Sequence, residues 1–126
     1  MNKVLHIEQK ADTPAIKFSP EGNLLIKGRS LPENAERFYT PIIEWTQNYV
    51  EEAPEDTELV VELEYFNSSS VKQILTILLE LENLLDENKR VKIRWVYNQD
   101  DELMEMKGRE MASLVDIPFD MESYTL

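Results

Sequence analysis

At residues 59–72 the chain reads LVVELEYFNSSSVK, and this stretch predicts the central strand of the fold and the helix that follows it. Its first eight residues have the composition of a central strand, with Leu59, Val61, Leu63 and Tyr65 expected on one face. An unbroken helical pattern begins directly after the serines and runs from about Ser69 to Glu87. Residues 91–97 then alternate apolar and basic side chains as a second strand does. Strand, helix and strand form a βαβ unit, whose crossover is right-handed.

The segments around this unit predict the rest of one α/β domain. Two short β-like runs at 15–18 and 24–27 flank a Pro/Gly/Asn turn and are typical of a hairpin, and residues 4–7 form a further short strand. Residues 38–49 carry a helical stripe interrupted by Pro41, which predicts two short helices or one kinked helix, with Thr40 able to cap the second part.

The C-terminal quarter predicts one more helix and a short edge element. Residues 98–101 can cap a helix that reaches about Val115, with its inward side chains expected at Leu103, Met106, Met111 and Leu114. Ile117 to Phe119 form the edge element. The expected fold is a single compact domain over residues 1–126: a small mixed sheet of about five strands, N-terminal hairpin plus βαβ unit, packed with about three to four helices.

Composition restricts the possible functions. The chain has 126 residues and a net charge of −12, so a nucleic-acid partner is not expected because phosphate backbones would be repelled. No stretch approaches the roughly 20 apolar residues of a membrane helix, so membrane insertion is not expected either. With no cysteine there is no disulfide framework, and a cytoplasmic location is the simplest interpretation.

Few residues have the spacing of a catalytic or metal site. The single histidine, His6, is far in sequence from the serines, and a nucleophilic Ser-His-Asp arrangement would need it. Ser69 and Lys72 match a serine-x-x-lysine pattern without the other motifs of that enzyme class. The acidic group at 100–105 lacks the spacing of a calcium loop and is explained by helix capping. We therefore predict no enzyme activity, no metal and no cofactor.

The three serines are the most informative polar residues. Asn67 or Ser68 can serve as the N-cap of the following helix, which by itself explains one or two polar side chains. A phosphate on one of these serines would meet free backbone N–H groups at the positive end of the helix. Two interpretations stay open from the residues alone: a helix cap and nothing more, or a reversible phosphorylation switch.

Four groups of residues carry a resemblance to a known family, in this order along the chain: 28–34 (GRSLPEN), Phe38-Tyr39-x-Pro41, 65–72 (YFNSSSVK) and Trp95-x-Tyr97. From about Thr13 to Phe119 the chain resembles the SiaC family of bacterial regulatory phosphoproteins. The resemblance implies a fold similar to the STAS domain of anti-sigma-factor antagonists. It also implies partner switching: a serine/threonine kinase adds a phosphate, a PP2C-type phosphatase removes it, and the unphosphorylated form binds an output protein. In the best-known branch the output is a diguanylate cyclase, which links the switch to cyclic di-GMP and biofilm formation.

The resemblance assigns the phosphoacceptor to the hydroxyl residue that follows the asparagine, which is Ser68 here and threonine in the best-known branch. Ser69 and Ser70 are secondary candidates. Asn67, Tyr65, Lys72 and Arg29 are the expected partner- or phosphate-binding residues. The alternative is a STAS-like protein-binding module whose serines only cap the helix.

Overall fold

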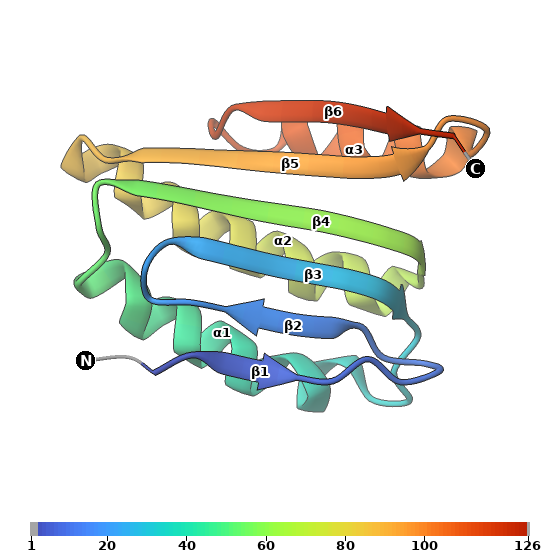
Figure 1. Cartoon of the computed structure of the whole chain (residues 1–126), viewed down its shortest axis with the longest axis horizontal. Coiled ribbons are helices and arrows are strands. Elements are labelled where there is room, and N and C mark those ends of the chain that lie inside the picture. The colour runs from blue at the N-terminus through green and yellow to red at the C-terminus, as the bar shows by residue number, and fades with distance from the viewer. Residues whose placement is uncertain (1–2, 126) are drawn as a thin grey trace.

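Six strands form one mixed sheet in the same order as they occur in the chain (Figure 1). The computed structural model describes residues 3–125. The strands are β1 (Leu5–Ile7), β2 (Ala15–Phe18), β3 (Asn23–Ser30), β4 (Asp56–Phe66), β5 (Arg90–Asn98) and β6 (Phe119–Tyr124). The helices are α1 (Ala35–Glu51), α2 (Ser68–Glu82), the 3₁₀ segment η1 (Asn83–Glu87) and α3 (Glu102–Ser113). The α/β class, the hairpin and the βαβ unit are confirmed, with one strand more than expected.

All three α-helices lie on one face of the sheet, behind the strands in Figure 1. The four strands β3 to β6 are parallel, and each helix connects one of them to its next neighbour in the same direction. Because such crossovers share one hand, successive helices must fall on the same side. The core therefore lies between the helices and one sheet face, and no helix within residues 3–125 covers the opposite face.

Helix α1 is continuous through Pro41, so two separate helices were the wrong alternative. Pro41 is exposed, and the carbonyl of Arg37 that loses its donor can be hydrated there. The hydroxyl of Thr40 donates to the carbonyl of Glu36 at 2.6 Å inside the helix and caps nothing. Asn34 caps the helix through the backbone N–H of Arg37, so the helix begins at Ala35.

A bulge in β4 corrects the expected direction of Tyr65. Gly28 of β3 pairs with Leu63, whereas Arg29 pairs with Tyr65, so Glu64 is an extra residue in β4. One extra residue reverses the alternation of a strand. Tyr65 is consequently 41% exposed, while Phe66 is buried. Gly28 has φ +125°, a backbone conformation that favours glycine at this irregularity.

Of the four side chains predicted to point inward from α3 and its C-terminal end, only Met111 is buried, so the helix presents a largely different face. Leu103, Met106 and Leu114 are about half-exposed, and the buried side consists of Met104, Gly108 and Met111. A Cβ atom on Gly108 would lie 2.5 Å from the Trp95 ring, so glycine permits an unusually close approach. The Trp95 indole N–H donates to the carbonyl of Met104 at 2.9 Å. These two contacts with Trp95 determine how α3 is rotated.

Candidate functional site: the serine turn between β4 and α2

The serine turn lies at the carboxyl end of β4, where α2 begins. Asn67 has extended backbone angles and is the N-cap of α2. Its side-chain oxygen Oδ1 accepts a hydrogen bond from the backbone N–H of Ser70 at 3.0 Å. A short polar side chain at this position satisfies one of the N–H groups that a helix start leaves free. Ser68, Ser69 and Ser70 therefore form the first turn of α2.

The hydroxyls of the three serines have different surroundings. Ser68 is exposed, and its hydroxyl makes no hydrogen bond within residues 3–125. Ser69 is exposed too, but its hydroxyl donates to Oδ1 of Asn67 at 3.0 Å. Ser70 is fully buried. Of the three hydroxyls, only that of Ser68 is both exposed and without a hydrogen-bond partner within residues 3–125.

A buried hydroxyl cluster, formed by Ser30, Tyr39 and Ser70, lies beneath the turn. Oγ of Ser70 is 2.8 Å from Oγ of Ser30 and donates to the carbonyl of Ser30 at 3.1 Å. Oγ of Ser30 is in turn 2.6 Å from the hydroxyl of Tyr39. Burial disfavours the phenolate and raises the pKa of Tyr39 to about 12, although the nearby hydroxyls of Ser30 and Ser70 act in the opposite direction. Tyr39 is therefore a neutral hydrogen-bonding group.

The basic side chains near the turn include one that the sequence did not indicate. Lys72 and Arg29 are both exposed, and neither forms an ion pair within residues 3–125. Arg29 lies opposite Tyr65 in the β3–β4 register. Nζ of Lys107 in α3 lies 4.9 Å from the centre of the Phe66 ring. Phe66 is the residue directly before Asn67 in the chain. No spacing in the sequence links Lys107 to the turn, because tertiary packing alone brings α3 to this edge.

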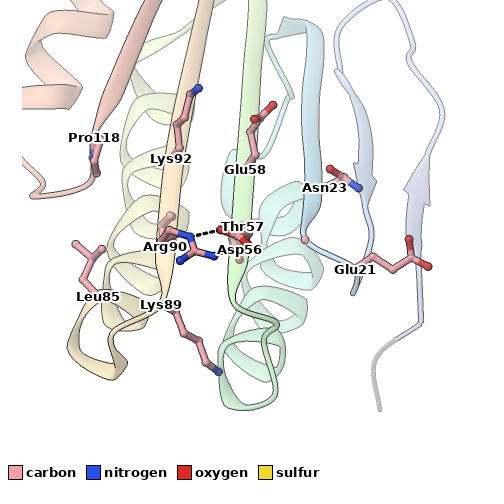
Figure 2. Close-up of a pocket in the computed structure, with 12 residues that line it drawn as sticks. Glu21, Asn23, Asp56, Thr57, Glu58, Leu85, Lys89, Arg90, Lys92 and Pro118 are labelled. Carbon is pink, nitrogen blue, oxygen red and sulfur yellow. Dashed lines mark hydrogen bonds and ion pairs between the residues drawn. The ribbon is translucent and has the colours of Figure 1, made fainter.

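A surface cavity of about 650 Å³ lies at the opposite end of the sheet (Figure 2). Its basic side chains are already engaged. The guanidinium of Arg90 binds the carboxylate of Asp56 with two hydrogen bonds, and Nζ of Lys89 donates to the carbonyl of Ala53 at 2.7 Å. Nζ of Lys92 is 2.8 Å from a carboxylate oxygen of Asp120. The cavity is formed at the amino ends of β4 and β5, whereas ligands of open α/β sheets bind at the carboxyl ends. The serine turn remains the better candidate.

The remaining candidates from the sequence lie elsewhere or form no cluster. His6 is exposed on the edge strand β1, three strands away from β4. Asp101 is the N-cap of α3, with Oδ1 accepting from the backbone N–H of Met104 at 3.0 Å, as expected for a capping role. Within residues 3–125 no three acidic or histidine side chains gather as a metal site would require. None of the helices described there has the length and hydrophobicity that a bilayer crossing needs.

Comparisons with known proteins by family model and by structure all find SiaC proteins. The sequence model for the SiaC family regulatory phosphoprotein matches residues 7–124. An uncharacterized protein of Pseudomonas aeruginosa (strain UCBPP-PA14) is 30% identical over 121 residues, which cover 95% of this chain and 96% of that protein. The crystal structure of apo-SiaC from P. aeruginosa has a TM-score of 0.89 and 28% identity, covering 97% of this chain and 100% of that one. A chain in the structure of the diguanylate cyclase SiaD in complex with its activator SiaC, also from P. aeruginosa, has a TM-score of 0.89 and 30% identity. The match covers 95% of this chain and 99% of that one.

Proposed function

Because this chain belongs to the SiaC family of regulatory phosphoproteins, we propose that it is a phosphorylation-controlled adaptor whose switch residue is Ser68. One observation carries the choice of residue. Among the three serines of the turn, Ser68 has the exposed hydroxyl without a hydrogen-bond partner in residues 3–125. A kinase can take its proton without first breaking an internal contact.

The start of α2 is suited to hold a phosphate on Ser68. The first N–H groups of the helix have no internal acceptor, and the macrodipole is positive at this end. The phosphate would carry close to two negative charges, and the exposed Lys72 lies about one helical turn further along. The free protein therefore tolerates the modification without rearranging α2.

A neutral turn and a phosphorylated turn offer a partner very different surfaces. Tyr65 and Arg29 are exposed beside each other where the bulge turns Tyr65 outward. A protein that covers these side chains together with the Ser68 hydroxyl must desolvate the turn. Desolvating a dianion costs far more free energy than desolvating a hydroxyl, so phosphorylation weakens such a complex.

The output protein that we propose is a diguanylate cyclase, which the unphosphorylated form binds and activates. The support is that SiaC of P. aeruginosa is the activator of the diguanylate cyclase SiaD, with which it forms a complex. A serine/threonine kinase and a PP2C-type phosphatase complete the cycle. In this role the chain acts by binding, without catalysis of its own.

The test compares how tightly a variant with a neutral side chain at position 68 and a variant with a negatively charged one bind the cyclase. We expect Ser68→Ala to bind SiaD of P. aeruginosa like the wild type, and Ser68→Glu to bind at least about tenfold more weakly, which corresponds to about 1.4 kcal/mol. Calorimetric titration measures binding, and cyclic di-GMP production measures activation. Ser113→Glu is the matched control, because it adds the same charge at an exposed serine at the far end of α3.

Phosphate mapping on protein isolated from its own cells completes this test. A phosphate on Ser68 supports the switch. Equal binding by both Ser68 variants would contradict it, and so would protein that stays unmodified under several growth conditions. Those results would favour the STAS-like binding module, in which Asn67 and the serines serve as a helix cap.

A further inference from the structure

Three segments that are distant in sequence meet at the hydroxyl cluster. Ser30 ends β3, Tyr39 lies in the second turn of α1, and Ser70 lies in the first turn of α2. All three side chains are fully buried. Ser30 is also joined to the turn by its backbone, because its carbonyl accepts from the N–H of Asn67 at 3.1 Å. The cluster therefore connects the serine turn to both neighbouring elements.

The proton positions in the cluster follow from counting donors. Each hydroxyl has one proton to donate. Ser70 uses its proton for the carbonyl of Ser30, so at the 2.8 Å contact Ser30 must be the donor. Ser30 then has none left, and Tyr39 must donate at the 2.6 Å contact. The chain of hydrogen bonds runs from Tyr39 through Ser30 to Ser70 and ends at the backbone of Ser30.

We propose that Ser30 and Tyr39 are positioning residues that select Ser68 as the phosphoacceptor by sequestering Ser70; this inference rests on the proposed function. A kinase that approaches the turn meets three hydroxyls within three residues. The backbone carbonyl of Ser30 accepts hydrogen bonds from the Ser70 hydroxyl and from the N–H of Asn67. The Ser30 hydroxyl, held in turn by Tyr39, donates to the buried oxygen of Ser70. Without the cluster the first turn of α2 opens more often, and Ser70 becomes available to the same enzyme.

A second buried tyrosine, Tyr49, provides a control that distinguishes the selection of Ser68 from a general effect on stability. Tyr49 lies in the same helix, is buried, and its hydroxyl is 2.6 Å from Oγ1 of the buried Thr57. This bond lies near the start of β4, at the opposite end of that strand from the serine turn. Tyr49→Phe and Tyr39→Phe therefore each remove one phenolic hydrogen bond of the same length and leave the aromatic ring in place.

The experiment maps phosphate by fragment mass spectrometry on four proteins expressed in the native host: wild type, Tyr39→Phe, Ser30→Ala and Tyr49→Phe. In the wild type and in Tyr49→Phe we expect phosphate on Ser68. In Tyr39→Phe and Ser30→Ala the share on Ser70 rises by about fivefold to tenfold, the factor by which losing one buried hydrogen bond changes a local opening equilibrium. Amide hydrogen exchange of Ser68 to Val71 should accelerate in the same two variants and stay unchanged in Tyr49→Phe.

Each possible result decides between the two proposals. Wild-type protein without phosphate overturns the proposed function and the selecting role with it. Phosphate on Ser68 alone in all four proteins overturns the selecting role, whatever the exchange rates at the turn, and leaves the switch intact. If Ser30→Ala does not fold, Tyr39→Phe still gives the comparison, because it removes one hydroxyl group and no ring atoms.

Discussion

Asn67 and Asn34 cap their helices with the same hydrogen bond. Oδ1 of Asn67 accepts from the N–H of Ser70, and Oδ1 of Asn34 accepts from the N–H of Arg37, both at 3.0 Å. The two residues differ in their neighbours, since Asn67 also binds the hydroxyl of Ser69 and the carbonyl of Ser30. Comparing them separates the capping of a helix from the shaping of the serine turn.

We expect Asn67→Ala and Asn34→Ala each to lower the free energy of unfolding by about 1 kcal/mol, the usual cost of losing an N-cap. Urea denaturation followed by circular dichroism measures this loss. Only Asn67→Ala should also reduce phosphate on Ser68, because it releases the turn. An equal reduction in Asn34→Ala would mean that phosphorylation responds to overall stability and not to the local geometry of the turn.

At the scale of elements, the packing of α3 depends on Gly108. Helix propensity alone predicts that Gly108→Ala stabilises the protein by about 1 kcal/mol. The new Cβ atom would lie 2.5 Å from the Trp95 ring, so we expect the opposite sign, a loss of about 1–3 kcal/mol through overpacking. Urea denaturation followed by tryptophan fluorescence measures the sign. Ser113→Ala, at an exposed position of the same helix, should change stability little, and stabilisation by Gly108→Ala would refute the close approach.

For the molecule as a whole, one sheet face carries no helix of the described residues, and the net charge is strongly negative. Parallel strands normally have both faces covered. Here the open face carries ion pairs between exposed or half-exposed groups, such as Lys27 with Glu62 and Arg94 with Glu58 and Glu122. The carboxylate of Glu122 has a lowered pKa because the Arg94 guanidinium donates to it. Exposed pairs of this kind contribute little to stability, roughly 0–1 kcal/mol each.

Salt should therefore stabilise this protein. The net charge of −12 creates self-repulsion, and raising NaCl from about 20 mM to about 500 mM shortens the Debye length from about 20 Å to about 4 Å. We expect the thermal midpoint to rise over this range, measured by calorimetry at neutral pH. A fall in the midpoint would show that the ion pairs of the open face outweigh the repulsion.

Local patterns predicted more of the fold than of the site. The strand and helix on either side of the serines follow from residues within a few positions of one another, and both are present. The role of Asn67 as N-cap follows in the same way. The inward face of α3 did not follow, because Leu103 and Met104 are equally apolar and only contact with Trp95 decides between them. The direction of Tyr65 failed for a related reason, since a bulge appears only when β4 pairs with β3.

The serine turn, the helix that follows it and the family can be inferred from the sequence alone, because capping, periodicity and motif order are properties of neighbouring residues. Which serine hydroxyl lacks a hydrogen-bond partner within residues 3–125 is evident only once the chain is folded. Ser68, Ser69 and Ser70 are identical as residues, and they differ only because Ser30 and Tyr39 bury one of them and Asn67 binds another. Lys107 likewise reaches the turn through the packing of α3 against Phe66 and Trp95. Ser30 and Ser70 are 40 residues apart in sequence, and a contact of that kind depends on how the chain packs and not on any local pattern.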